Sequence, residues 1–211
     1  MWLHWLDRAL MPSKKTLLIV FVKAPRLGFV KTRLAQSLGD EEALKAFRWM
    51  VEKLLKNLEG WRDLQLRFAP SEAEEEIRPW LQPQWQASPQ SEGGLGERLI
   101  DAFEDGFRLG AEEVIIIGSD CPHIQQEDIA AASVSLDHHD LVLGPSTDGG
   151  YWLVGLKQSR PELFEDINWS TETVLKETLG KAEQAGLSVE LLRELEDIDT
   201  AEEWERLERS G

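Results

Sequence analysis

Basic side chains gather in one short stretch of this sequence, directly after the apolar run Leu17–Val22. With 23 lysines and arginines in 211 residues, about one is expected in any eleven, whereas residues 23–33 hold four. Gly28 permits close backbone approach, and Pro25 stiffens the entry to the loop. A phosphate group needs positive charge and backbone N–H donors, so the stretch is typical of a phosphate-binding loop, although a solvated basic loop has the same composition. The four cations are Lys23, Arg26, Lys31 and Arg33.

Aspartates follow strand-like segments at three places. Asp120 comes directly after the buried run at residues 113–118, and Asp148 lies in a glycine-flanked loop between two expected strands. Asp197 and Asp199 lie in a further strand-to-helix turn. Magnesium takes one or two carboxylates beside waters and substrate phosphates, so two such aspartates at a sheet edge would suffice for a metal site. Turn-forming or helix-capping aspartates are the alternative, and it is strongest for Asp199.

Composition and charge narrow the class of protein. The formal net charge of -16 and the pI near 4.7 argue against a general nucleic-acid binder, because phosphate backbones would be repelled by most of the surface. Any phosphate ligand must therefore be small and bound locally. The single cysteine, Cys121, allows no intrachain disulfide and is typical of a small buried thiol. We therefore expect a reducing compartment, and so a cytoplasmic location.

The first fifteen residues are expected to form an N-terminal extension to a single domain that covers residues 16–211. Leu3, Leu6 and Leu10 recur at helical spacing, which indicates a short amphipathic helix. Such a helix would either dock onto a surface or pack loosely as a peripheral extension. It is too short to cross a bilayer and lacks the basic start of a signal peptide. We therefore expect no membrane span.

Strand-like and helix-like segments alternate along the remaining chain, which predicts an α/β fold with three layers. Loops at the carboxyl ends of its strands would carry the ligand site. We expect a helix to begin at Asp40, a capping box between Ser71 and Glu74, and a later helix capped by Ser170 or Thr171. Strands are expected within residues 17–22, 63–70, 84–89, 113–118, 140–156 (two strands) and 187–195, and helices within 40–58, 71–80, 96–110, 125–136, 169–186 and 197–209.

Six motifs occur in an order that is found in a known bacterial family: FVKAPRLGFVKTRL, GLGERL, IIIGSDCP, GPSTDGGYWLVGL, NWSTETVL and DIDTAEEWERL. From about Leu17 onward the chain resembles the glycosyltransferase-A-type family of radical-SAM/selenodomain-associated transferases, formerly a domain of unknown function. That family is similar to the nucleotide-diphospho-sugar transferase superfamily, which includes molybdenum-cofactor and phospholactate nucleotidyltransferases. The resemblance implies a three-layer α/β/α sandwich with a mixed, mostly parallel sheet, and a divalent cation, Mg²⁺ or Mn²⁺, as cofactor.

The resemblance also implies roles for residues within the matched motifs. Asp120 would be the catalytic metal ligand, and Asp148 would lie near the metal or the acceptor. The sequence departs from the family where Gly93 and Gly94 replace a usual acidic residue. It also lacks the Asp-x-Asp pair of many glycosyltransferases around Asp120, which looks more like the nucleotidyltransferase branch. The nucleotide phosphates would contact Lys23, Pro25, Gly28, Lys31, Arg33 and Arg98, and the acceptor side would be bordered by Trp169, Ser170 and Thr171.

The leading functional prediction is a metal-dependent transferase that uses a nucleotide-activated donor, in its simplest form glycosyl transfer from a nucleotide-diphospho-sugar. An alternative is nucleotidyl transfer, in which a phosphorylated acceptor attacks a nucleoside triphosphate and pyrophosphate leaves. A third alternative is a nucleotide-binding protein without chemistry, because a second carboxylate beside Asp120 is missing. The expected partners are the donor and a small-molecule acceptor. Nine tryptophans leave room for an apolar interface, so a homo-oligomer stays open.

Overall fold

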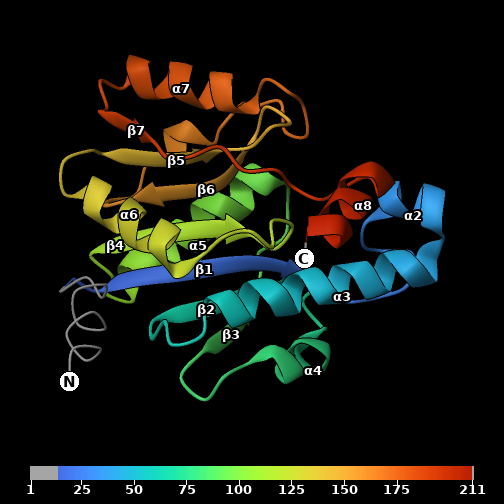
Figure 1. Cartoon of the computed structure of the whole chain (residues 1–211). Helices are drawn as coiled ribbons and strands as arrows, with labels where there is room; N and C mark the ends of the chain where they lie inside the picture. Colours follow the sequence, from blue (N-terminus) through green and yellow to red (C-terminus); the bar gives the residue numbers. More distant parts are fainter. Residues whose placement is uncertain (1–13, 211) are drawn as a thin grey trace, which may run out of the picture.

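The fold is built on one seven-stranded sheet in a computed structural model that describes residues 14–210 (Figure 1). The strand order is β3-β2-β1-β4-β6-β5-β7. Six strands run parallel, and β6 alone is antiparallel to its neighbours β4 and β5. The expected mixed, mostly parallel sheet is therefore confirmed. The strands are β1 Thr16–Lys23, β2 Leu64–Ala69, β3 Gln86–Pro89, β4 Glu113–Gly118, β5 Leu141–Pro145, β6 Tyr151–Leu156 and β7 Val189–Leu191.

Helices cover both faces of this sheet, so the α/β/α sandwich is also confirmed (Figure 1). Apolar residues of α3 and α6 pack in one core layer, and those of α5 and α7 pack in the other. The helices are α2 Thr32–Leu38, α3 Asp40–Asn57, α4 Glu74–Ile77, α5 Leu95–Arg108, α6 Gln126–Leu136, α7 Val174–Gln184 and α8 Ala201–Ser210, with short 3₁₀ turns at Arg78–Trp80 and Pro161–Leu163.

The strand β1 shows how the sequence pattern fixes the two core layers. Leu18, Val20 and Val22 belong to the layer with α3 and α6, whereas Ile19 belongs to the layer with α5 and α7. Successive side chains of a strand point to opposite faces, so a continuous apolar run is buried on both sides. Each such side chain stabilises the fold by about 1.5–3 kcal/mol relative to an exposed position. This buried strand holds the basic loop at a fixed edge of the sheet.

Three local predictions were wrong. Residues 32–38 form α2 although the basic stretch was expected to be a loop, and this helix buries only Leu34, too little for a periodic signal. Ser71 caps nothing, because α4 begins at Glu74 after Ala73 without a side-chain cap. Neither Ser170 nor Thr171 caps α7, since this helix begins at Val174 after Thr173. Ser170 has a positive φ of 64°, which takes the chain out of helical geometry before α7 starts.

The described residues contain no helix that is long and apolar enough to cross a membrane. The amphipathic helix expected around Leu3, Leu6 and Leu10 lies outside residues 14–210.

Candidate functional site

The loops after β1, β4 and β5 meet at the carboxyl edge of the parallel strands. Lys31 follows β1 and Asp120 follows β4, and the Nζ atom of Lys31 lies 2.9 Å from Oδ1 of Asp120. Asp199, just before α8, lies 2.7 Å from the same Nζ atom through its Oδ1. Residues that are far apart in the sequence thus converge where open α/β sheets bind their ligands. Lys31 and Asp120 were expected at this edge, and the structure brings them together.

Lys31 is almost completely buried: its side chain is 3% exposed, against 51% for Asp120 and 40% for Asp199. Burial lowers the pKa of Lys31, but the two carboxylates together raise it above its ordinary value. Lys31 therefore stays protonated. It precedes α2 with a left-handed backbone, φ 48°, an uncommon conformation for a lysine.

Asp199 reaches Lys31 because a neighbouring residue caps α8. The Oγ1 atom of Thr200 accepts a hydrogen bond from the backbone N–H of Glu203 at 3.4 Å. In return, Oε2 of Glu203 accepts from the N–H of Thr200 at 2.7 Å, which completes a capping box. The alternative role of Asp199 as the helix cap therefore does not hold, and its carboxylate is directed to Lys31 instead.

Residues 192–200, which we call the C-terminal crossover, tie two of these loops together through their backbone. The N–H of Leu195 donates to the carbonyl of Pro145 at 3.0 Å, and the N–H of Thr147 donates back to Leu195 at 3.1 Å. Further along, the N–H of Ile198 donates to the carbonyl of Asp120 at 3.2 Å. The crossover thus fixes the loops after β5 and β4 relative to each other.

Asp148 lies in the loop between β5 and β6. Its Oδ1 atom accepts hydrogen bonds from the hydroxyl of Ser146 at 2.5 Å and from the backbone N–H of Gly150 at 2.9 Å. These two bonds stabilise the turn between β5 and β6. The turn-forming alternative is therefore correct for Asp148, whereas helix capping is not. Its charge also reaches the rest of the cluster, because it is one of the groups that raise the pKa of Asp197.

Asp197 is the most strongly perturbed carboxyl group in the cluster. Burial raises its pKa, and the charges of Asp120, Asp148 and Asp199 raise it further, whereas Lys31 lowers it. The outcome is a pKa of about 7. Carboxylates gathered in this way carry more negative charge than one lysine balances, and such perturbed groups are common in functional sites.

Gly149 joins this loop to the turn before α7. Its φ is +88°, and a Cβ atom there would overlap the backbone carbonyl of Glu172. The N–H of Leu175 also donates to the carbonyl of Gly149 at 3.0 Å. The loop that carries Asp148 therefore lies directly against the turn that follows Ser170.

We expect Gly149→Ala to lower the free energy of unfolding by roughly 2–3 kcal/mol, because it combines a strained φ with a backbone clash. Urea denaturation would measure the change. The matched control is Gly180→Ala inside α7, where a Cβ meets nothing within 4 Å. This control should raise the free energy of unfolding by up to about 1 kcal/mol. Equal stability of the two variants would contradict the tight contact at Gly149.

The expected acceptor residues lie beside the start of α5. A Cβ atom on Gly96 would lie 2.9 Å from Nε1 of Trp169, so only glycine permits this approach. The Trp169 ring also packs edge-on against Tyr151, with ring centroids 6.4 Å apart. Arg98, one turn into α5, donates from Nε to the carbonyl of Gly93 at 3.0 Å.

The other cations of the basic stretch divide into two groups. Arg33 is exposed, and its Nη1 atom lies 3.9 Å from Oδ2 of Asp199, so it belongs to the carboxylate cluster. Arg26 turns away toward α4, where its Nε and Nη2 atoms bind Glu76 at 3.0 and 2.6 Å.

Lys23 is exposed at the end of β1. Of the remaining two predicted contacts, Pro25 is buried with its carbonyl 3.4 Å from Nη2 of Arg48, and Gly28 is exposed with φ +76°.

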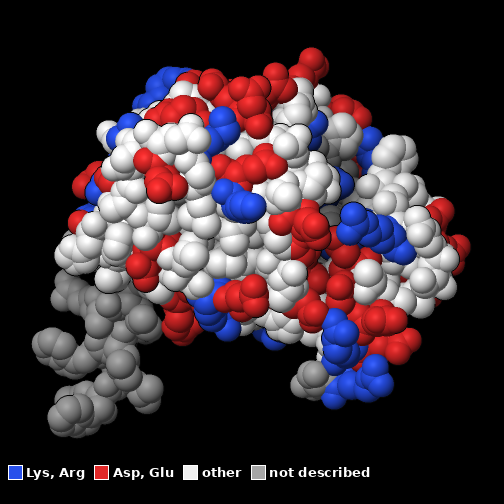
Figure 2. Space-filling model, turned by 90° about the horizontal axis from the view of Figure 1, so that it is seen from above, with Lys and Arg blue, Asp and Glu red and all other residues white. Residues whose placement is uncertain are grey.

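Charge on the surface agrees with this division. Acidic side chains spread over the face in Figure 2, and on the side where α2 and α8 lie several basic side chains stand among them beside a hollow.

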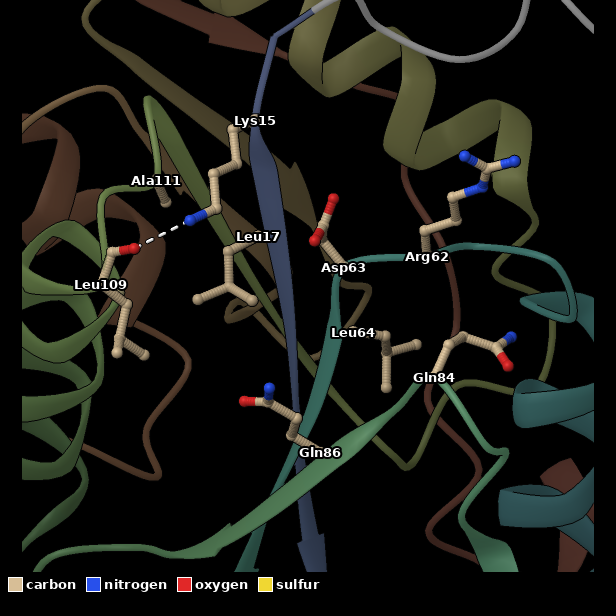
Figure 3. Close-up of a pocket in the computed structure, with 10 residues that line it drawn as sticks. Lys15, Leu17, Arg62, Asp63, Leu64, Gln84, Gln86, Leu109 and Ala111 are labelled. Carbon is tan, nitrogen blue, oxygen red and sulfur yellow. Dashed lines mark hydrogen bonds between the residues drawn. The ribbon is translucent and has the colours of Figure 1, made fainter.

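A second depression, of about 180 Å³, lies at the opposite edge of the sheet (Figure 3). Lys15, Asp63 and Gln86 line it, at or just before the starts of β1, β2 and β3. The Lys15 ammonium there already donates to the carbonyl of Leu109 at 2.8 Å. This depression contains none of the predicted site residues, and it lies away from the carboxyl edge where α/β ligands bind.

The donor set fits a divalent cation in its chemistry. Carboxylate oxygens are the ligands that Mg²⁺ and Mn²⁺ prefer. Burial raises the pKa of Asp197, and the negative charges of Asp120, Asp148 and Asp199 raise it further. Within residues 14–210, however, no three carboxyl, imidazole or thiol groups stand in an arrangement that could hold a metal ion. The ammonium of Lys31 lies between Asp120 and Asp199 instead.

Cys121, the residue after Asp120, is buried, and burial raises the pKa of its thiol to about 12. Such a thiol is typical of a structural cysteine.

Comparisons with known proteins agree with this architecture. The family model described as "Uncharacterized protein conserved in bacteria (DUF2064)" matches residues 54–171. A curated 2-phospho-L-lactate guanylyltransferase from Methanocaldococcus vulcanius is 28% identical over 142 residues, which are 66% of this chain and 61% of that protein. The chain thus spans less than two thirds of the length of this relative.

Two solved structures extend the comparison. A protein from Desulfovibrio desulfuricans G20, provisionally assigned as a nucleotide-diphospho-sugar transferase, is 33% identical with a TM-score of 0.87. The match covers 93% of this chain and 87% of that one. A Mycobacterium tuberculosis protein solved with manganese is 14% identical with a TM-score of 0.54 and covers 93% of this chain and 100% of that one, which shows a shared fold.

Proposed function

Since this chain belongs to the bacterial family DUF2064, we propose that it is a metal-dependent nucleotidyltransferase, which joins a nucleoside triphosphate to a phosphorylated acceptor and releases pyrophosphate. Its relatives class it among nucleotide-dependent transferases. The curated relative named as a guanylyltransferase supports nucleotidyl transfer within that class. The single aspartate after β4, without an Asp-x-Asp pair, supports the same choice.

One observation carries the proposal: a buried ammonium, that of Lys31, lies within hydrogen-bond distance of carboxylates from two separate loops. Cations and metal-binding oxygens side by side at the carboxyl edge are what a triphosphate requires. Arg33 adds a second cation on the exposed side of Asp199.

The transfer itself follows from these groups. A phosphate oxygen of the acceptor attacks the α-phosphorus of the triphosphate and forms a new P–O bond. The bond from the α-phosphorus to the bridging oxygen breaks in line, and pyrophosphate leaves with that electron pair. Lys31 and Arg33 would neutralise the charge that develops on the leaving group. Lys23, Pro25, Gly28 and Arg98 would complete the phosphate contacts.

Asp120 and Asp148 would hold the divalent cation, and Asp199 shares the ammonium of Lys31 with Asp120. A cation bound there supplies neutralising charge to the phosphates and orients them for attack. The manganese found in a protein of the same fold supports a divalent cation here. Asp120 is the main ligand in this proposal, because it follows the buried strand β4 and contacts Lys31 directly.

The acceptor would bind on the side of Trp169, Ser170 and Thr171. The contact of Gly149 with Glu172 supports this, because it places the turn next to the Asp148 loop. The hydroxyl of Thr171 is already used by Asn168 and Thr173, at 2.7 and 2.8 Å. Ser170 is exposed, and its hydroxyl makes no hydrogen bond to any residue within 14–210, so it is the better donor to an acceptor phosphate.

Glycosyl transfer is the second candidate, favoured by the relative from Desulfovibrio desulfuricans that was provisionally assigned as a nucleotide-diphospho-sugar transferase. The two reactions differ in the bond that breaks. Nucleotidyl transfer releases pyrophosphate, whereas glycosyl transfer releases a nucleoside diphosphate.

The test incubates the protein and Mn²⁺ with the four common nucleoside triphosphates and 2-phospho-L-lactate, and in parallel with a panel of nucleotide sugars. We expect pyrophosphate release and a new nucleotide adduct from at least one triphosphate. If 2-phospho-L-lactate is not the acceptor, no pyrophosphate is released. Thermal stabilisation of the protein by a triphosphate then measures nucleotide binding by itself. Stabilisation and diphosphate release by a nucleotide sugar alone would overturn the proposal in favour of glycosyl transfer.

A further inference from the structure

The ammonium of Lys31 lies between the carboxylates of Asp120 and Asp199. It lies 2.9 and 2.7 Å from one oxygen each of Asp120 and Asp199. These distances are those of strong, charge-assisted hydrogen bonds. The two carboxylates are half-exposed, so a ligand can approach them from solvent while Lys31 holds them from the protein side.

The fold directs Lys31 to this position. Lys31 is the residue before α2, and Asp199 lies two residues before α8. Leu34 of α2 and Ile198 of the C-terminal crossover belong to one small core cluster, which packs the two helices together. The side chain is therefore delivered by packed elements and by a left-handed backbone, and it does not swing freely on the surface.

A metal ion alone would meet an obstacle at this site. Binding it would draw the oxygens of Asp120 and Asp199 away from Lys31 and leave a buried ammonium without a partner. Such an unpaired buried charge costs several kcal/mol. A triphosphate that arrives with the metal removes this cost, because its phosphate oxygens give Lys31 a new anionic partner.

We propose that Lys31 is the resident counter-ion of the carboxylates of Asp120 and Asp199. The phosphates of a nucleotide must pair with Lys31 before these two carboxylates can bind a metal ion. Metal and nucleotide then bind with positive cooperativity, and each raises the affinity for the other by the same factor. The inference rests on the proposed function in taking a divalent metal ion and a nucleoside triphosphate as the two ligands.

The test measures Mn²⁺ binding without nucleotide, from the signal of free Mn²⁺ in electron paramagnetic resonance. We expect Lys31→Met to bind Mn²⁺ at least about 10-fold more tightly than the wild type, since its carboxylates are no longer engaged. The control is Lys45→Met, which removes the same charge from an exposed pair with Glu42 on α3. This control should leave Mn²⁺ affinity unchanged.

Equal or weaker Mn²⁺ binding by Lys31→Met would overturn the counter-ion role. A second measurement uses the wild type alone, so it does not depend on how the variant folds. A non-hydrolysable triphosphate should tighten Mn²⁺ binding at least about 10-fold, and equal affinity with and without bound triphosphate would overturn the cooperativity. If no triphosphate binds, the proposed function fails, whereas the comparison of Lys31→Met with the wild type still decides the role of Lys31.

Discussion

Asp120→Asn is expected to lower the rate of product formation by at least about 10³-fold while the protein stays folded. The substitution removes the charge that would bind the metal and that holds Lys31 at 2.9 Å. Because the Asp120 side chain is 51% exposed, its loss leaves the core intact. Initial rates of pyrophosphate release would measure the effect, and circular dichroism would verify the fold.

The control for this experiment is Asp63→Asn, at the opposite edge of the sheet (Figure 3). Asp63 is exposed, so the variant changes the same charge without touching the carboxylate cluster. It should keep the rate of the wild type. An Asp120→Asn variant that retains more than about a tenth of the wild-type rate would remove Asp120 from the chemistry.

Asp197→Asn should stabilise the protein in metal-free buffer at pH 8 by about 4 kcal/mol. The folded-state pKa of Asp197, about 7, lies above its ordinary value of 3.8. Between these values the unfolded chain loses a proton that the folded chain keeps, so stability falls as the pH rises. The full penalty is present above pH 7 and absent below about pH 4. An asparagine carries no such penalty.

Urea denaturation at pH 8 and pH 4, with a chelator present, would measure this difference. We expect a large gap between wild type and Asp197→Asn at pH 8 and almost none at pH 4. If the gap is the same at both pH values, the carboxyl group is not held in its protonated state by its neighbours.

The sheet could be predicted from local patterns because its strands are continuous apolar runs. Leu17–Val22 was expected and Thr16–Lys23 is observed, a difference of one residue at each end. Burial of both faces makes such runs unambiguous. In contrast, α2 escaped prediction because a seven-residue helix with one buried residue has no period to detect.

The site could be predicted only in part, for a different reason. Asp120 and Lys31 follow strongly apolar strands, so their position at the sheet edge follows from sequence. Asp199 stands next to Thr200, and either residue could cap α8. The choice depends on Lys31, which lies 168 residues earlier and which no local pattern connects to Asp199.

The C-terminal crossover has a consequence for the order in which the protein matures during synthesis. The strands β1 to β6 and the residues Lys31, Asp120 and Asp148 have all been translated before residue 199 is made. A nascent chain can therefore build most of the sheet and still leave the ammonium of Lys31 without one of its two carboxylates. Contacts of such long sequence separation form late in folding. The carboxylate cluster around Lys31 is thus complete only after residue 199 has been translated and packed against the loops after β1 and β4.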